Sequence, residues 1–165
     1  MNNLKTNIKI LNIKNIQNCI NLIKKNTKDY NYYQRLGWKK EQFINQIKKN
    51  INYSLALIEN DIIIGFMLGD LLISNKKIEY EILFIYIDEG FRNRGNGRLL
   101  LESLFTSKFN FPLTKIHLEV EASNMNAIYF YKKNQFAQVG IRKNYYKLFE
   151  NKKIDAILFT KIINE

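Results

Sequence analysis

The segment LEVEASNMNAIYFYKKNQF, from Leu118 to Phe136, holds a carboxylate, an amide and a phenol around a change in pattern. Its first part alternates apolar and polar residues, which predicts a strand, and its second part has helical spacing. Glu119 lies in the strand, Asn124 stands at the helix N-cap, and Tyr131 follows about two turns later. A carboxylate can remove a proton from an attacking group, and a neutral phenol can give one to a departing group. This spacing fits either an active site laid across an element boundary or ordinary packing.

The alternatives for these side chains stay open at the level of sequence. Glu119 shares one strand face with His117 and Glu121, and this acidic face either attracts a cationic amine in a cleft or simply meets solvent. Tyr131 has apolar and aromatic neighbours, so it is equally suited to pack in a core. His117 is the only histidine, and we interpret it as structural, with tuning of Glu119 as the alternative.

The loop FRNRGNGR opens a helix predicted over about residues 95–108 and is suited to hold a phosphate. Gly95 and Gly97 would let a backbone approach a ligand closely, and the amides from Asn93 to Arg98 would point outward at the helix start. The P-loop pattern and the dinucleotide pattern are both absent, because no Gly-Lys-Ser/Thr occurs and a leucine replaces the last glycine. An ordinary glycine-containing turn before an amphipathic helix is the alternative.

The remaining pattern supplies the elements that position these groups. Asn60-Asp61 is a two-residue hairpin signal, and the continuous apolar run EILFIYI indicates a strand inside a sheet. Strands mixed with helices in this order predict an α/β (α+β) fold with a largely antiparallel sheet in one domain, 1–165. The predicted strands are 6–14, 53–59, 62–72, 78–88, 115–122, 136–146 and 154–163, and the predicted helices are 15–26, 38–50, 95–108 and 124–133.

Composition limits the function classes. The chain has 165 residues, one cysteine and a formal net charge of +11. No apolar run is long enough for a membrane span, and no secretory signal or metal-ligand cluster is recognisable, so we expect a cytoplasmic protein without metal or membrane contact. Cys19 lies on a helical apolar face and is interpreted as a core residue. The positive charge indicates a polyanionic partner, such as nucleic acid, ribosome or a phosphorylated cofactor, or else a lysine-rich codon bias.

Two signatures resemble those of GNAT N-acetyltransferases. Arg92-Asn-Arg-Gly95-Asn-Gly97 resembles the acetyl-CoA signature R-x-x-G-x-G, and the series Asn124, Ala127, Tyr131, Phe136 resembles the second signature. LEVEASN, IRKNYY (141–146) and DAILF (155–159) are similar to stretches of the bacterial ribosomal-protein-alanine N-acetyltransferases, the RimI type. The resemblance implies a mixed, mostly antiparallel sheet of about seven strands, about four helices and a splayed strand pair that holds acetyl-CoA.

The resemblance also implies residue roles. Glu119 would be the general base and Tyr131 the general acid in a direct transfer that releases CoA. Tyr145, Tyr146 and Trp38 would line the substrate slot, with aromatic packing as the alternative for the two tyrosines. The implied acetyl-CoA-binding residues are Ile85, Tyr86, Ile87, Arg92, Asn93, Arg94, Gly95, Asn96, Gly97, Arg98 and Asn124.

The implied substrate is the N-terminal α-amine of a protein that begins with alanine, in particular a small-subunit ribosomal protein. We expect a monomer or weak dimer that does not require nucleic acid. Two alternatives remain, namely a GNAT enzyme for another amine (lysine side chain, polyamine or small molecule) and a basic RNA- or ribosome-binding module. The chain departs from the branch around the substrate wall and at the end of the 124–133 helix; the departing residues are Gly37, Lys39, Phe84, Tyr86 and Gln135.

Overall fold

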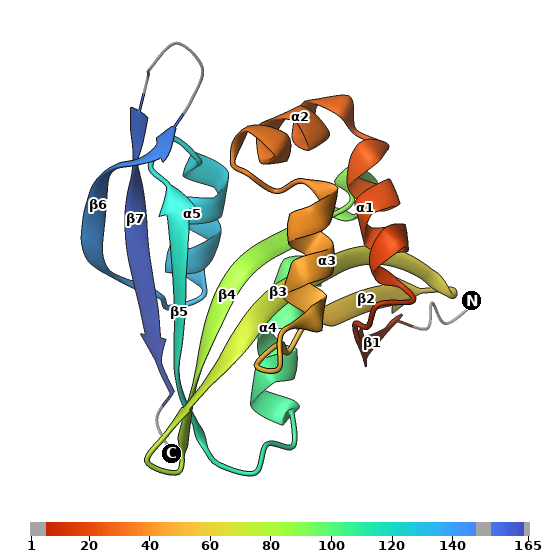
Figure 1. Cartoon of the computed structure of the whole chain (residues 1–165). Coiled ribbons are helices and arrows are strands. Elements are labelled where there is room, and N and C mark those ends of the chain that lie inside the picture. Colours follow the sequence, from red (N-terminus) through yellow and green to blue (C-terminus); the bar gives the residue numbers. More distant parts are fainter. Residues whose placement is uncertain (1–5, 148–152, 164–165) are drawn as a thin grey trace. The chain divides into compact units, whose positions relative to one another are not determined.

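A computed structural model describes residues 6–147 and 153–163 of the chain (Figure 1). In these residues a seven-stranded sheet has the order β1-β2-β3-β4-β5-β7-β6. β4 and β5 are parallel, whereas the pairs β1–β2, β2–β3, β5–β7 and β6–β7 are antiparallel. The mixed, mostly antiparallel fold predicted from sequence is therefore confirmed.

The strands are β1 (Thr6–Ile10), β2 (Leu55–Glu59), β3 (Ile62–Ser74), β4 (Lys77–Ile87), β5 (Leu113–Glu121), β6 (Ala137–Lys147) and β7 (Lys153–Ile162). The helices are α1 (Ile16–Lys24), α2 (Thr27–Arg35), α3 (Lys40–Lys48), α4 (Asn96–Thr106) and α5 (Met125–Lys133), with a short 3₁₀ helix η1 (Glu89–Phe91). The chain forms two compact units: the first unit is Met1–Asp70 with Phe84–Lys108, and the second unit is Leu71–Leu83 with Phe109–Glu165.

Both tight turns between β2, β3 and β4 follow from local residue chemistry. Asn60 and Asp61 have φ angles of 49° and 63°, and Asn75 and Lys76 have φ angles of 50° and 57°. Two successive residues with positive φ make the type I′ turn that matches the twist of a hairpin, and asparagine and aspartate tolerate this conformation. The predicted Asn60-Asp61 hairpin and the polar turn at 74–77 are thus confirmed.

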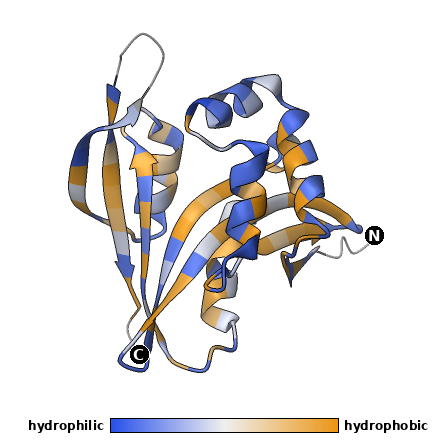
Figure 2. Ribbon diagram, viewed as in Figure 1, coloured by the Kyte–Doolittle hydropathy of each residue, from blue (hydrophilic) through white to orange (hydrophobic). Residues whose placement is uncertain are grey.

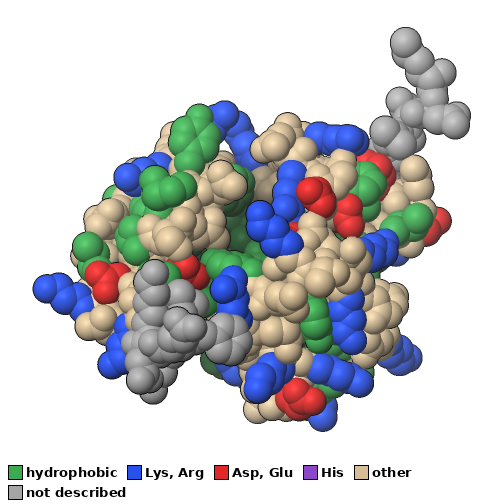
Figure 3. Space-filling model, turned by 90° about the horizontal axis from the view of Figure 1, so that it is seen from above, with side chains coloured by type: hydrophobic (Ala, Val, Ile, Leu, Met, Phe, Trp, Pro, Cys, Tyr) green, Lys and Arg blue, Asp and Glu red, His purple; other side chains and the backbone are tan. Residues whose placement is uncertain are grey.

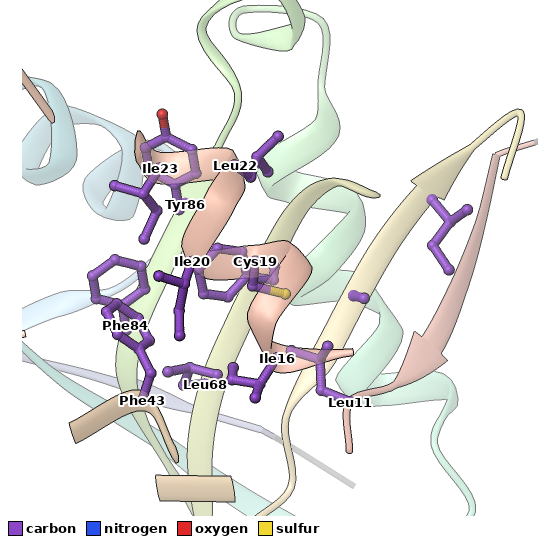
Figure 4. Packing of buried hydrophobic residues seen from close by; sticks show 13 residues of the cluster. Leu11, Ile16, Cys19, Ile20, Leu22, Ile23, Phe43, Leu68, Phe84 and Tyr86 are labelled. Atoms are coloured by element: carbon purple, nitrogen blue, oxygen red, sulfur yellow. The ribbon is translucent and has the colours of Figure 1, made fainter. Parts of the chain in front are cut away.

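The core of the first unit lies between helices and strands. In Figure 1, α1 and α3 lie in front of the strands and α4 lies behind them. Polar and apolar bands alternate along α1 in Figure 2, as an amphipathic helix requires. Figure 4 shows Cys19 among Ile16, Ile20 and strand residues. Burial raises the pKa of the Cys19 thiol to about 12, so it is a core residue, as predicted, rather than a nucleophile.

Two sequence-based expectations were incomplete. The strand predicted to Lys14 ends at Ile10, because the Asn12 and Asn15 side chains accept hydrogen bonds from nearby main-chain amides and turn the chain. Helix α2 was not predicted, because none of its residues is fully buried and its packing face is formed by tyrosines, Tyr30 and Tyr33, which are partly buried against the core. Its sequence signal is the cap at Asn26, whose side chain accepts from the Asp29 amide at 3.0 Å.

The second unit contains β5, β7 and β6 with helix α5. The ring of Tyr131 lies 5.4 Å from that of Phe136 and 6.3 Å from that of Phe159, measured between centroids. The parallel ladder of β4 and β5 runs from Ile78–Leu113 to Ile82–Leu118, and both strands continue beyond it. This ending is what the predicted splayed pair requires. The predicted polar loop between the last two strands falls mostly on residues 148–152, outside the described residues.

Candidate active site

The glycine loop of the first unit offers main chain to a ligand. Gly95 is the N-cap of α4 and has φ +82°, a left-handed conformation that favours glycine. A Cβ at this position would meet no heavy atom within 4 Å, so the loop has open space beside it. The first amides of α4 have no partner within the helix and carry its positive dipole end. The loop therefore has the features that its sequence suggests for a phosphate site, and phosphate binding stays a prediction. Arg94 and Arg98 bring positive charge to it, with Arg98 Nε 2.7 Å from Glu102 Oε1.

The side chains of Arg92 and Asn96 hold the loop itself. Arg92 Nε donates to the Ile87 carbonyl at 2.9 Å, and its guanidinium also pairs with Asp29. Asn96 is buried and its amide donates to the Phe91 carbonyl at 2.9 Å. Sequence reasoning expected the Arg92 guanidinium to add charge and the Asn96 main chain to help hold the diphosphate, and both expectations stay predictions. In the structure these side chains fix the conformation that presents the main chain.

Tyr86 and Asp29 complete this arrangement. The Tyr86 hydroxyl donates to Asp29 Oδ2 at 3.1 Å, and the Arg92 guanidinium lies 5.4 Å from the centre of the Tyr86 ring. Burial, followed by the charge and hydrogen bond of Asp29, raises the pKa of Tyr86, so its proton stays on. Tyr86, which replaces the small residue common at this position in the RimI type, thus ties helix α2 to the loop after β4.

Strand β3 lies close beside strand β4 at the end of β4 that is predicted to bind the cofactor. A Cβ on Gly65 would lie 2.9 Å from the Tyr86 carbonyl oxygen and closer still to Ile87, so only glycine lets the strands approach here. Ile85 and Ile87 are partly exposed, whereas Tyr86 is buried. The main chain of these residues remains the predicted contact for the pantetheine arm.

Trp38 belongs to an aromatic cluster of the first unit. Its ring lies 5.1 Å from Phe43 and 4.9 Å from Phe84, between centroids. Phe84, which departs from the usual asparagine, is buried by these contacts. Gly37 has φ +91°, and Lys39 is the N-cap of α3 without a side-chain capping bond, which the usual serine would supply. The role of Trp38 in substrate binding stays a prediction.

In the second unit, Glu119 lies at the centre of a polar group. Its Oε1 is 3.1 Å from Arg142 Nη1, and the side chains are 19% and 54% exposed, respectively. Burial, and then the charge and hydrogen bond of Glu119, raise the pKa of Tyr145. Burial and the charge of Glu119 likewise raise the pKa of Tyr146. The structure therefore brings Glu119, Tyr145 and Tyr146 together, and the role of the two tyrosines in substrate binding stays a prediction.

A bulge in β6 aims Arg142 and Tyr145 at this group. The register of β6 against β7 shifts between Arg142 and Tyr146. Asn144 sits in the bulge with φ 56°, and its amide donates to Asp155 Oδ1 at 2.8 Å. A bulge re-aims side chains and is common beside active sites. Arg142 was missed as a site residue because its partner Glu119 is distant in sequence. The sequence signal for the bulge is Asn144, since asparagine tolerates a left-handed conformation.

Asn124 and Tyr131 occupy the elements predicted for them. Asn124 is the N-cap of α5, and its Oδ1 accepts from the Ala127 amide at 3.1 Å. Tyr131 is buried, and its ring belongs to the aromatic core of the second unit. Packing accounts for the ring, and the catalytic role of the hydroxyl stays a prediction, as does the contact of Asn124 with the cofactor.

His117 is structural in this arrangement. Its Nδ1 lies 2.9 Å from the Thr160 hydroxyl and its Nε2 lies 2.9 Å from Glu79. The hydrogen bond from His117, followed by that from Lys115, lowers the pKa of Glu79. Both ring nitrogens thus have partners away from Glu119, as the structural interpretation expected.

Three further observations concern possible binding partners, namely the surface charge, the helices and the metal-ligating side chains. Lys and Arg side chains are spread over the face drawn in Figure 3. Within residues 6–147 and 153–163, every helix is too short or too polar to span a bilayer. Over the same residues, the His, Cys, Asp and Glu side chains form no group of three or more that could hold a metal ion.

Comparison with known proteins now identifies the family. Residues 13–136 match the family described as acetyltransferase (GNAT) family. A ribosomal protein bS18-alanine N-acetyltransferase of Salmonella typhimurium is 33% identical over 110 residues, which is 66% of this chain and 70% of that protein. The Escherichia coli enzyme of the same name is 30% identical over 122 residues, which is 73% of this chain and 78% of that protein.

Solved structures show the same fold. The crystal structure of Arabidopsis thaliana NAA60 with a bisubstrate analogue has a TM-score of 0.78 at 19% identity, covering 97% of this chain and 100% of that chain. The ribosomal-protein-alanine N-acetyltransferase of Escherichia coli has a TM-score of 0.74 at 22% identity, covering 98% and 96%. The chain therefore belongs to the acetyltransferase (GNAT) family, whose members use acetyl-CoA.

Proposed function

We propose that the protein transfers the acetyl group of acetyl-CoA to the N-terminal α-amine of a protein that begins with alanine, in particular a small-subunit ribosomal protein. The observation that carries the proposal is the group around Glu119, where a carboxylate, an arginine and two tyrosines lie close together. The named activity of the relatives at 33% and 30% identity supports the same substrate. We infer that the two units work as one acetyltransferase domain, 1–165.

The proposed reaction needs a base and an acid. An N-terminal amine has a pKa near 8 and is mostly protonated at neutral pH. Glu119 accepts this proton, directly or through water, so that the nitrogen gains a free electron pair. Acetyl-CoA supplies an activated acyl group, and the new C–N bond replaces its C–S bond. Tyr131 gives its proton to the departing sulfur, which completes CoA. The nitrogen loses its second proton as the amide forms, and this proton restores the phenol of Tyr131 through solvent.

The other proposed roles concern binding. Main-chain amides from Asn93 to Arg98 hold the diphosphate, with Arg92, Arg94 and Arg98 adding charge. The main chain of Ile85–Ile87 binds the pantetheine arm, and Asn124 contacts the cofactor. Tyr145, Tyr146 and Trp38 line the slot for the first residues of the substrate. The open space beside Gly95 supports the first of these assignments.

The test compares three amines in the presence of acetyl-CoA. The first is a peptide that begins with a free alanine, the second is the same peptide with a blocked N-terminus and an internal lysine, and the third is spermidine. The proposal expects mass spectrometry to find the acetyl group on the first peptide alone. Turnover of only the second or third amine would instead favour a GNAT enzyme for another amine.

A separate experiment distinguishes an acetyltransferase from an RNA-binding module. An acetyltransferase shows a rise in melting temperature with acetyl-CoA, because a ligand of the folded state stabilises it. An RNA-binding module would show no such rise, and its RNA affinity would fall steeply with salt. We further propose a cytoplasmic monomer or weak dimer that needs no nucleic acid, which sedimentation of the purified protein tests.

A further inference from the structure

Glu121 is a buried carboxylate that the proposed mechanism leaves without a role. It is 5% exposed and lies at the end of β5. Its Oε1 accepts a hydrogen bond from the Ser123 hydroxyl. Its Oε2 is buried and, within the described part of the chain, has no hydrogen-bond partner. A buried carboxylate oxygen without a donor destabilises a fold, which points to a donor that binds from outside.

The surroundings of Glu121 are those of the Glu119 group. Strand alternation puts residues 119 and 121 on one face of β5. Burial is the main cause of the raised pKa of Tyr146, and the charges of Glu119 and Glu121 both add to it. Both carboxylates therefore lie near one phenol, that of Tyr146, which keeps its proton.

The charges of this group leave room for one cation. Arg142 is 3.1 Å from Glu119 and offsets one of the two carboxylates. One negative charge remains, and a primary ammonium carries one positive charge and three N–H donors. Such a cation can donate to two carboxylates at once, which a neutral amine cannot do with equal strength.

We propose that Glu121 is a second amine-binding carboxylate, whose Oε2 accepts an N–H of the cationic substrate amine while Glu119 takes the departing proton. The inference rests on the proposed function and narrows its substrate to primary amines that arrive with a single positive charge. Glu121 binds and orients the amine, so its contribution is to affinity more than to the chemical step.

The test is the variant Glu121→Gln, which keeps the size of the side chain and removes its charge. We expect the KM for the substrate peptide to rise about tenfold, with kcat changed by less than about threefold, because uniform binding is lost. The KM for acetyl-CoA should stay unchanged. A merely structural role would reduce the active fraction, and hence kcat, without this rise in KM.

The control is Glu79→Gln in the same unit. Glu79 is also a carboxylate of the sheet, but its oxygens already pair with Lys115 at 3.1 Å and with His117 at 2.9 Å. We expect the KM of Glu79→Gln for the peptide to equal that of the wild type. If Glu79→Gln raised KM as much as Glu121→Gln, the effect would be one of general charge and the inference would fail.

A second readout avoids catalysis. Calorimetry with CoA present compares the peptide with an analogue whose α-amine is replaced by hydrogen. The wild type should prefer the amine, and Glu121→Gln should lose most of that preference. If Glu121→Gln does not fold, Glu121→Asp retracts the carboxylate by one methylene and carries the same test, with a raised KM supporting the inference and an unchanged KM overturning it.

The two proposals fail in different ways. Wild-type KM and wild-type preference in Glu121→Gln would overturn the role of Glu121 and leave the N-terminal acetyltransferase activity intact. Turnover of spermidine or a lysine side chain alone would overturn the proposed substrate. In that case the same KM comparison, made with the amine that does react, would still test Glu121.

Discussion

Each unit contains an arginine that pairs with a carboxylate beside a tyrosine, and the two groups differ in how their polar atoms are used. In the first unit, Arg92 donates to the Ile87 carbonyl and pairs with Asp29, which also accepts from Tyr86. In this closed group the Tyr86 hydroxyl and two nitrogens of Arg92 have protein acceptors. Its effect is to fix the loop after β4, and a contact of Arg92 with the cofactor stays a prediction.

The group in the second unit is open by comparison. Arg142 pairs with Glu119 but is 54% exposed. Glu121 has a buried oxygen without a partner in the described residues. Satisfied polar networks stabilise, whereas unsatisfied groups mark a place where a ligand completes the bonding. This difference supports our proposal that the first unit binds the cofactor mainly through its main chain, and that the second unit acts through side chains.

The largest effect expected from this comparison is that of Glu119→Gln. Loss of a general base should lower kcat/KM for the peptide by about 10²- to 10⁴-fold at pH 7. The loss should shrink above about pH 8, because solvent then supplies a deprotonated amine. Steady-state rates from pH 6 to pH 9, with the KM for acetyl-CoA as control, measure this. A loss that is equal at all pH values would contradict a base and favour simple charge attraction.

Tyr131→Phe asks whether the second unit uses the phenol or only its ring. Phenylalanine keeps the packing on Phe136 and Phe159, so the melting temperature should stay within about 2 °C. The rate should fall about 10²-fold, at the low end for acid catalysis, because a thiolate is a good leaving group. Single-turnover rates with bound acetyl-CoA measure the chemical step. A wild-type rate would make Tyr131 a packing residue only.

Sequence reasoning succeeded where the determinant is local. The turn at Asn60-Asp61 and the cap at Asn124 follow from what these side chains do to their own backbone. The loop before α4 followed from glycine at a left-handed position. Helix α2 was missed because its packing face consists of partly buried tyrosines, so its cap at Asn26 was the clearer signal.

The rest could not be predicted because it depends on distant partners. The sequence cannot show that Arg92 pairs with Asp29, since the two residues are 63 positions apart. Nor can it show that Glu121 is buried, because the strand pattern placed it on a polar face. The bulge at Asn144 depends on Asp155 in the next strand. Each of these features decides whether a charged side chain is structural or available.

Asp29→Asn tests the closed group. The variant keeps the shape of the side chain but removes the charge that Arg92 and Tyr86 share. We expect the free energy of unfolding to fall by about 1–2 kcal/mol, because the pair is only partly buried. The kcat for the peptide should change by less than about threefold. Urea unfolding followed by circular dichroism measures the first quantity.

Glu102→Gln is the matched control for this variant. Glu102 pairs with Arg98 at 2.7 Å, but both side chains are largely exposed. Its loss should cost less than about 0.5 kcal/mol. Asp29→Asn could instead lower the free energy of unfolding no more than Glu102→Gln does and yet abolish turnover. The first unit would then be using its side chains for catalysis, and the comparison of the two units would be wrong.

The smallest effect is expected at Gln135, where the second unit carries strain unrelated to its open group. Gln135 follows α5 with φ 68°, at the position where the RimI type usually has glycine. Gln135→Gly should raise the free energy of unfolding by about 0.5–1 kcal/mol, since relief of the left-handed strain exceeds the added entropy of the unfolded chain. Activity should not change.

Gln135→Ala separates the backbone from the side chain. It removes the contact of Gln135 Oε1 with Lys161 Nζ at 3.4 Å but keeps the Cβ and therefore the strain. Thermal unfolding of both variants should place glycine about 2 °C above wild type and alanine at or below it. A loss of activity in Gln135→Gly alone would mean that the strained turn positions Tyr131, four residues earlier. The open group would then extend to the end of α5, because backbone strain that persists at a site is held there by its function.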